Sequence, residues 1–434
     1  MSNQELDAII NKVENEKKVF VKKSALDTSN PPEKIVSRQD EIEKIVRYIS
    51  DYKQGQVVPL VSIYGRSGTG KSTLVRYVCN YIQEIELCFV NLRKAKTVFG
   101  TVNLILNELD QPSLSSAQGM NLGMEKIREA ILNSMQVQKK KLFVLALDEF
   151  DVIFYDKRGN PSDFVYKLVE MLAELKEKNC LAMIFTISNN IVSDYNLDDR
   201  VKSRIGNSEI FFKPYTKEET MKILQQRAKE AFGKKIDDKV LEQCADISFL
   251  EHGDARRAVD LLRVSAEIAA NEGKEISVEH IKAGSKQLQK DRVSEVISSI
   301  SYHSKMISLV LAAKAYALDD EWHTTKSIFE SYKKRLSTEP VSYRRFSELL
   351  NDLENTGFVN SKTGSKGHKG YKSEFQLTVD PEIVGEIINK KWWEENIVKH
   401  KANFDKADSE GNKKSNPYHK MYQAVKKQHA ETYL

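Results

Sequence analysis

The sequence predicts an α/β chain in three parts: a parallel-sheet domain with a phosphate-binding loop, an all-α domain, and a C-terminal winged helix-turn-helix domain. Three observations predict it. Residues 65–72 read Gly-Arg-Ser-Gly-Thr-Gly-Lys-Ser, between an apolar segment and a helical pattern. Residues 142–147 form an unbroken apolar run that ends in two acids. Helical patterns over residues 306–356 precede a glycine- and lysine-rich hairpin at 358–377.

The composition sets outer limits. The 434 residues suggest two or three domains, and the 40% hydrophobic fraction is enough to build their cores. A net charge of +5 does not by itself prove a nucleic-acid partner. The four cysteines form no C-x-x-C pair, so we expect buried, reduced thiols of an intracellular protein rather than a zinc site. No apolar run approaches the roughly 20 residues of a membrane span, so we expect no membrane partner.

The glycine-rich loop lies between an expected strand at 57–64 and a helix over 73–79. Backbone N–H groups and the helix dipole there would bind phosphate. We expect Lys71 to reach the β- and γ-phosphates of ATP and the Ser72 hydroxyl to hold Mg²⁺. An ordinary glycine turn before a helix is the alternative, and the strand and helix context disfavours it. The predicted nucleotide-binding residues are Gly65, Arg66, Ser67, Gly68, Thr69, Gly70, Lys71, Ser72 and Thr73.

The apolar run at 142–147 predicts a strand buried on both faces, with its carboxyl end at the edge where open α/β sheets bind ligands. Asp148 would hold the Mg²⁺ shell, and Glu149 would orient and deprotonate the attacking water. The alternative is a strand end with two solvated acids. The phosphate loop nearby makes the catalytic interpretation the better one.

The chain divides into five stretches. Residues 1–30 are polar and predict a loosely held arm, and residues 31–215 predict the nucleotide-binding domain, with a first helix at 40–52 and further strands at 87–90, 181–187 and 208–212. Residues 216–292 predict helices only, beginning at a Thr216-x-x-Glu219 capping box and broken near Gly233 and Gly253. Residues 293–390 predict the winged-helix domain. Residues 391–434 predict a tail whose Trp392–Trp393 pair packs on the body and whose remainder is either disordered or a late helix at 418–429.

The winged-helix pattern consists of helices at 306–318, 324–336 and 342–356, then a hairpin. The helix at 342–356 would enter the major groove of DNA and the hairpin would contact the flanking backbone. A winged helix used only for protein contact is the alternative. The predicted DNA-binding residues are Ser342, Tyr343, Arg344 and Arg345 on the helix, and Lys362, Lys366, His368, Lys369 and Lys372 on the hairpin.

From about residue 31 to 379 the chain resembles AAA+ ATPases, and more narrowly the archaeal replication-origin initiators of the origin recognition complex and cell division control type. Residues 37–42 resemble the family's N-terminal box near the adenine, which implies nucleotide contacts for Ile35, Val36 and Arg38. Residues 148–151 resemble its Walker B segment, and 186–190 its sensor-1 segment with Asn189 near the γ-phosphate. Residues 253–262 resemble the sensor-2 helix, with Arg256 reaching the nucleotide.

The resemblance also implies partners. Residues 197–204 resemble the arginine-finger segment, so Arg204, with Arg200 as competitor, would complete the site of a second copy or paralogue. The family implies binding of double-stranded origin DNA, slow Mg²⁺-dependent ATP hydrolysis that acts as a switch, recruitment of the minichromosome-maintenance replicative helicase, and a cytoplasmic, nucleoid-associated location. A DNA-contacting insertion is expected near 112–123, where this sequence matches loosely, with Arg93, Lys94 and Lys96 as nearby basic candidates.

Two other functions remain open. A clamp-loader-like remodelling subunit would hydrolyse ATP fast and carry a helical collar, which the hairpin at 358–377 disfavours. A nucleotide-switched DNA-binding regulator or defence sensor would more often continue into repeats or a sensor domain.

Overall fold

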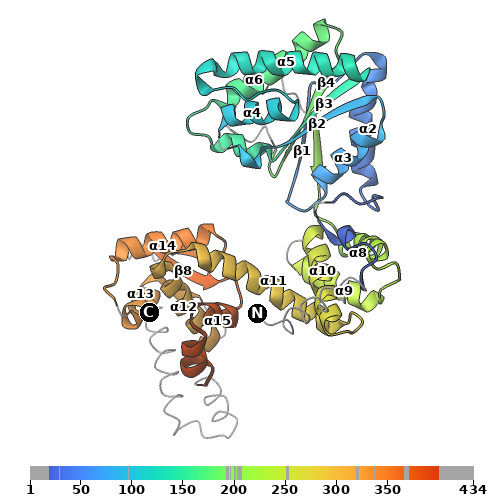
Figure 1. Ribbon diagram of the computed structural model, residues 1–434. Helices are drawn as coiled ribbons and strands as arrows, with labels where there is room; N and C mark the ends of the chain where they lie inside the picture. Colours follow the sequence, from blue (N-terminus) through green and yellow to red (C-terminus); the bar gives the residue numbers. More distant parts are fainter. Residues whose placement is uncertain are drawn as a thin grey trace, which may run out of the picture. The chain divides into compact units, whose positions relative to one another are not determined.

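The computed structural model describes residues 19–28, 30–95, 97–191, 195, 197–199, 202, 208–250, 254–318, 322–336, 338–365 and 371–399 (Figure 1). The chain forms two compact units, 1–284 and 285–434, and each is described by itself.

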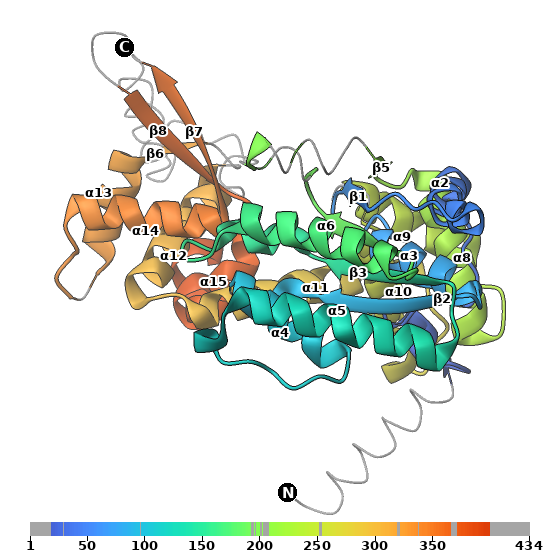
Figure 2. The same ribbon diagram turned by 90° about the horizontal axis from the view of Figure 1, so that it is seen from above.

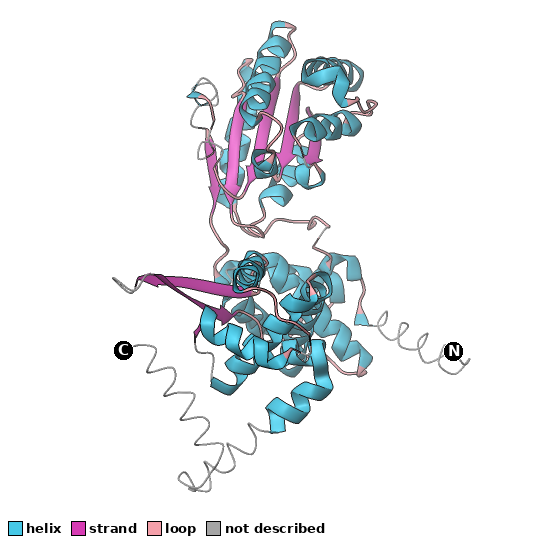
Figure 3. Cartoon of the chain, turned by 90° about the vertical axis from the view of Figure 1, so that its left-hand side faces the viewer, coloured by secondary structure: helices cyan, strands magenta, loops and turns pink. Residues whose placement is uncertain are grey.

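A five-stranded parallel sheet forms the centre of the first unit, as predicted (Figures 1 and 3). Its strands lie in the order β2-β3-β4-β1-β5. All five carboxyl ends therefore meet at one edge, and β4 separates the strand before the phosphate loop from the strand that ends in Asp148. The strands are β1 (Leu60–Gly65), β2 (Ile85–Asn91), β3 (Leu142–Asp148), β4 (Ala182–Ser188) and β5 (Glu209–Phe212).

Helices cover both faces of this sheet, which explains why β3 and β4 are buried along their whole length. One face packs against α4 (Val98–Glu108), α5 (Gly119–Gln138) and α6 (Pro161–Glu177). The other packs against α2 (Gln39–Ser50) and α3 (Lys71–Tyr81). Figure 1 shows these two groups on opposite sides of the strands. Residues 112–123, where a DNA-contacting insertion was expected, contain a short 3₁₀ turn (Ser116–Gln118) and the start of α5.

The all-α domain predicted at 216–292, here called the lid, begins at the predicted capping box. Thr216 Oγ1 accepts the Glu219 N–H at 3.2 Å and Glu219 Oε2 accepts the Thr216 N–H at 2.9 Å. Four helices follow, one of them ending at the predicted break, Gly233, in the left-handed conformation. The predicted boundary at 292 falls inside the last helix. The helices are α8 (Lys217–Phe232), α9 (Asp238–Leu250), α10 (Ala255–Asn271) and α11 (Val278–Ser299).

The described part of the N-terminal arm differs from the loose segment that the composition suggests. A 3₁₀ turn, η1 (Lys23–Leu26), packs on the lid, and Phe20, Ala25 and Leu26 are buried. Three buried apolar side chains in a charge-rich stretch contribute to this packing. The average composition of the segment conceals them.

The second unit is a winged helix, as predicted. Its helices are α12 (Tyr302–Leu318), α13 (Thr325–Arg335) and α14 (Tyr343–Asn355). Strands β7 (Val359–Ser365) and β8 (Tyr371–Leu377) pair antiparallel, with β6 (His323–Thr324) on the other side of β8. Figure 2 shows β7 and β8 projecting from the helices as a wing.

A further helix, α15 (Pro381–Trp393), closes this unit beyond the predicted elements. Trp393 is 1% exposed in the core, and its indole fills the space beside Gly385 where any Cβ would stand. The predicted packing of the tryptophan pair is thus confirmed for Trp393. A turn of π-helix, Glu394–Val398, follows. The helix expected at 418–429 lies outside the described residues.

The four cysteines are buried and unpaired, as expected. Burial raises the pKa of Cys79, Cys88 and Cys244 to about 12, so these thiols stay protonated. Among the helices that the structure describes, none has the length and apolarity needed to cross a bilayer.

Candidate functional site

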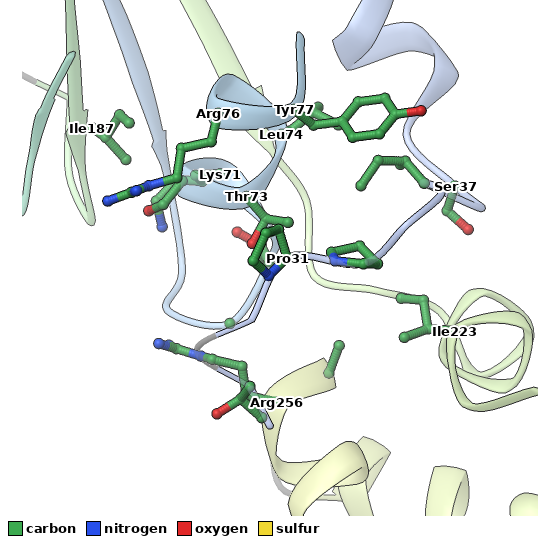
Figure 4. Close-up of a pocket in the computed structure, with 18 of the residues that line it drawn as sticks. Pro31, Ser37, Lys71, Thr73, Leu74, Arg76, Tyr77, Ile187, Ile223 and Arg256 are labelled. Carbon is green, nitrogen blue, oxygen red and sulfur yellow. The ribbon is translucent and has the colours of Figure 1, made fainter. Parts of the chain in front are cut away.

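A cavity of about 800 Å³ lies at the carboxyl edge of the sheet (Figure 4). Its walls are built by the loop between β1 and α3, α3 itself, the ends of β2, β3 and β4, Tyr215 of the linker, the lid helices α8 and α10, and Thr28 together with residues 31–37. Most of the predicted nucleotide residues line it. They are Ile35, Val36, Ser67, Gly68, Thr69, Gly70, Lys71, Ser72, Thr73, Asp148, Glu149, Asn189 and Arg256.

The phosphate loop needs its glycines. Gly68 and Gly70 have left-handed backbones, with φ of 77° and 89°. A Cβ on Gly68 would collide with the carboxylate of Asp254, and one on Gly70 with the Tyr215 hydroxyl. The loop therefore packs directly against the lid and the linker that leads to it.

Lys71 is the first residue of α3 and is buried. Its Nζ donates to the carbonyls of Gly65 at 2.6 Å and Arg66 at 2.8 Å. Those two residues thus support Lys71 without being among the described residues that line the cavity. Burial lowers the pKa of Lys71 to about 8, although Asp148 and Glu149 oppose the shift. The ammonium group therefore gains strongly from any further negative charge placed beside it.

Asp148 and Ser72 form an oxygen pair beside this lysine. Ser72 Oγ donates to Asp148 Oδ1 at 2.9 Å, Asn91 Nδ2 donates to Oδ2 at 3.3 Å, and the Glu149 N–H donates to Oδ1 at 3.1 Å. Burial raises the pKa of the Asp148 carboxyl. A hydroxyl and a carboxylate at this distance fit Mg²⁺, which commonly takes its remaining ligands from phosphates and water. No group of three or more metal-ligating side chains occurs among the described residues, so no all-protein cage competes with this arrangement.

Glu149 lines the same cavity from a left-handed backbone, with φ of 56°. Burial raises the pKa of its carboxyl, and the charges of Asp148 and Asp151 raise it further. Asp151 is buried and its Oδ2 accepts a hydrogen bond from Asn189 Nδ2 at 3.3 Å. Asp148, Glu149 and Asn189 thus line one cavity from the ends of β3 and β4, and Asp151 accepts a hydrogen bond from the asparagine.

The lid contributes Arg256 to the cavity wall. Asp254 caps α10 by accepting the Arg256 N–H at 2.9 Å. The guanidinium of Arg256 donates to the Ser67 hydroxyl on the phosphate loop, and its Nε lies 3.6 Å from Asp254 Oδ1. Figure 4 shows Arg256 extending from the lid toward the loop that precedes Lys71.

Arg38 is placed differently from the other N-terminal box residues. Among the described lining residues Ile35 and Val36 are present and Arg38 is not. Its guanidinium donates to the Lys213 carbonyl at 2.5 Å and to Glu41 at 3.1 Å, and lies 4.0 Å from the centre of the Tyr215 ring. The side chain therefore fastens α2 to the linker between β5 and the lid.

The winged helix presents a basic surface on α14. Ser342 caps the helix by accepting the Arg345 N–H at 3.3 Å, Tyr343 is exposed, and the side chains of Arg344 and Arg345 are 92% and 54% exposed. Both arginines pair with Glu348, at 3.4 and 2.9 Å.

On the wing, Lys362 Nζ lies 4.3 Å from the centre of the Trp322 ring and pairs with Glu374 at 3.3 Å. Of the other basic candidates, Arg93 and Lys94 lie on a short 3₁₀ turn after β2, and Arg93 lines the nucleotide cavity. Arg204, Arg200, Lys366, His368, Lys369 and Lys96 are outside the described residues, and the side chain of Lys372 is outside them too.

Sequence reasoning missed several residues of the cavity, among them Asn91 and Arg227. Asn91 ends β2 directly opposite Asp148 in the parallel register, but a single asparagine after a strand gives no signal until the neighbouring strand is known. Arg227 lies on the buried side of α8 and lines the cavity. Within the local sequence, only the position of Arg227 in the pattern of an amphipathic helix indicates that its side chain is buried.

Three family models match successive segments of the chain. The AAA ATPase domain family matches residues 34–181. The Cdc6 AAA+ ATPase-type lid domain matches residues 221–286, and the CDC6 C-terminal winged helix domain matches residues 295–387. The AAA ATPase match supports nucleotide binding and ATPase activity in general terms.

Similar proteins of known type span nearly the whole chain. It is 31% identical over 399 residues to the ORC1-type DNA replication protein of Thermococcus onnurineus, covering 89% of this chain and 95% of that protein. It is 32% identical over 375 residues to ORC1-type DNA replication protein 1 of Sulfolobus acidocaldarius, covering 83% and 90%. The solved structure of Aeropyrum pernix ORC1 in complex with DNA matches 88% of this chain and 98% of its own, with 27% identity and a TM-score of 0.68. The chain belongs to the ORC1/Cdc6 family of DNA replication initiators.

Proposed function

We propose that this protein is an ATP-dependent initiator that binds double-stranded origin DNA through its AAA+ and winged-helix domains and helps to load the replicative minichromosome-maintenance helicase. The observation that carries the proposal is that one chain combines two features. These are a cavity lined by Lys71, Ser72 and Asp148, and an exposed pair of arginines on α14. The Aeropyrum pernix relative was solved on DNA, which supports the DNA partner. Such a protein would act in the cytoplasm, associated with the nucleoid.

In the cavity, Lys71 binds the β- and γ-phosphates, and Ser72 and Asp148 hold Mg²⁺. The ion, when bound, would neutralise charge on the phosphates. Glu149 orients the attacking water and accepts its proton, which its raised pKa favours near neutral pH. Asn189 contacts the γ-phosphate.

We propose that hydrolysis is slow and acts as a switch. Arg256 belongs to the lid but reaches the phosphate loop, so loss of the γ-phosphate changes what holds the lid in place. Arg204 would stabilise transition-state charge in the site of a second copy or paralogue. Turnover would then depend on assembly.

On DNA, Arg344 and Arg345 at the start of α14 enter the major groove, with Ser342 and Tyr343 beside them. Lys362 and the other basic residues of the wing contact phosphates, which adds affinity without sequence information.

Binding of the purified, ATP-loaded protein to a genomic fragment library, with a salt titration, tests the proposal. Recovery of a few discrete loci, lost in an Arg344→Ala plus Arg345→Ala variant, is the expected result. Uniform, salt-sensitive recovery of all fragments would contradict it and favour a remodelling subunit whose DNA contact is secondary.

A further inference from the structure

Residues 20–28 and 30–37, here called the N-terminal strap, are fixed to the lid at one end. The N–H groups of Val21 and Lys22 both donate to the Ala231 carbonyl at the end of α8, at 2.8 and 3.0 Å. The ring of Phe20 stacks on Phe232 with 5.3 Å between ring centres. The start of the strap therefore moves with the lid.

Arg227 is the central fastening of the strap. It is buried on α8, and its guanidinium donates to the carbonyls of Ala25 at 2.9 Å and Asn30 at 3.0 Å. Burial lowers the pKa of Arg227, and Glu230 and Asp27 oppose the shift. A buried guanidinium held by two backbone carbonyls fixes the path of the chain between them. If the strap left, this charge would lose both partners.

The other end of the strap forms a wall of the nucleotide cavity. The cavity is lined by Thr28 and by residues 31–37, and Figure 4 shows Pro31 and Ser37 on that wall. Gln226, the residue before Arg227, donates from Nε2 to the Lys34 carbonyl at 2.7 Å. The strap then enters α2, so it joins the lid to the sheet domain by a second route besides the linker at 213–216.

We propose that the N-terminal strap is a clamp that controls release of nucleotide, and that Arg227 is the positioning residue that keeps it closed. The inference rests on the proposed nucleotide binding in this cavity. This wall and α3, whose first residue is Lys71, line the same cavity. Nucleotide cannot leave on that side until the strap moves, and the strap cannot move far while Arg227 holds both carbonyls.

The test measures two quantities on the full chain: the dissociation rate of a fluorescent ADP analogue, and the rate of trypsin cleavage after Lys22 or Lys23. In Arg227→Met we expect release about tenfold faster or more, from the loss of two charge-assisted hydrogen bonds, and faster cleavage. Arg227→Lys should restore part of both. Phe20→Ala removes only the stack on Phe232 and should shift both rates in the same direction by less.

Arg128→Met is the matched control. Arg128 is also partly buried, and the substitution removes its ion pair with Glu174, which joins α5 to α6. It should leave both rates near wild type even if it lowers the melting temperature. If wild-type protein binds the ADP analogue but Arg227→Met and Phe20→Ala release it at the wild-type rate, the clamp proposal is refuted and the proposed function is not. If the wild-type protein binds no nucleotide, the proposed function falls and the clamp with it.

Discussion

The ammonium group of Lys71 should make ATP affinity depend on pH above neutrality. Burial lowers its pKa to about 8, so above this pH the free protein holds a neutral amine in the phosphate loop. A bound triphosphate favours the protonated form and returns the pKa toward its ordinary value of 10.5. Binding between these two values must therefore take up one proton, and it weakens as pH rises.

The size of the effect follows from the two pKa values. Below about pH 7.5 both states are protonated, and the dissociation constant should not change with pH. Between about pH 8.5 and 10 only the bound state is protonated, and the constant should rise tenfold per pH unit. From pH 7 to pH 10 the loss is about 100-fold, or about 2.7 kcal/mol.

Equilibrium dialysis with labelled ATP at a series of pH values measures this slope. Lys71→Arg is the matched control, since a guanidinium stays charged throughout and should give a flat profile at whatever affinity it retains. Calorimetry in buffers of different ionisation enthalpy should find uptake of one proton near pH 9. A flat wild-type profile, or the same slope in Lys71→Arg, would refute the assignment of the buried lysine to phosphate binding.

Three further predictions concern other parts of the molecule. Glu149→Gln should keep ATP binding but slow phosphate release by about 100-fold or more, and normal release would remove this carboxylate from catalysis. Arg344→Ala plus Arg345→Ala should weaken DNA binding and reduce the preference for specific loci, by about 1–3 kcal/mol for each lost base contact. Unchanged affinity at matched salt would indicate a winged helix that binds protein. Gly68→Ala should lower nucleotide affinity and melting temperature because the N-cap carboxylate of α10 occupies the space of the new methyl group. Gly55→Ala, at a similar φ of 70° but in open space, should show the effect of backbone strain alone. Equal effects of the two substitutions would contradict the close contact at Gly68.

The sequence predicts those parts of the site whose functional groups lie within a few residues of one another in the chain. The phosphate loop needs left-handed glycines, a lysine and a hydroxyl within eight residues, and Lys71 and Ser72 stand where that spacing requires. The run that ends at Asp148 and Glu149 is equally local, because a strand buried on both faces has no polar residue until its end. The winged helix could also be predicted, because its helices and hairpin are consecutive in the sequence.

What could not be predicted depends on long-range contacts. Arg227 binds carbonyls about 200 residues earlier in the sequence, and any residue at those positions supplies a carbonyl, so no pattern marks its partners. The strap itself is charge-rich and only its few apolar residues indicate packing. Asn91 becomes a partner of Asp148 only because β2 lies beside β3, which is a property of the strand order and not of either segment.

The left-handed backbone at Glu149 explains how two adjacent acids serve one cavity. Neighbouring residues of a strand point to opposite faces of the sheet, so a regular continuation of β3 would turn Glu149 away from Asp148. Instead β3 ends at Asp148, the backbone turns at Glu149 with φ of 56°, and both carboxylates line the cavity. Such a conformation costs about 1–3 kcal/mol for a residue other than glycine, and it persists only where the surroundings enforce it. Here the Glu149 N–H donates to the Asp148 carboxylate, so the bond that stabilises the turn also joins the two acids.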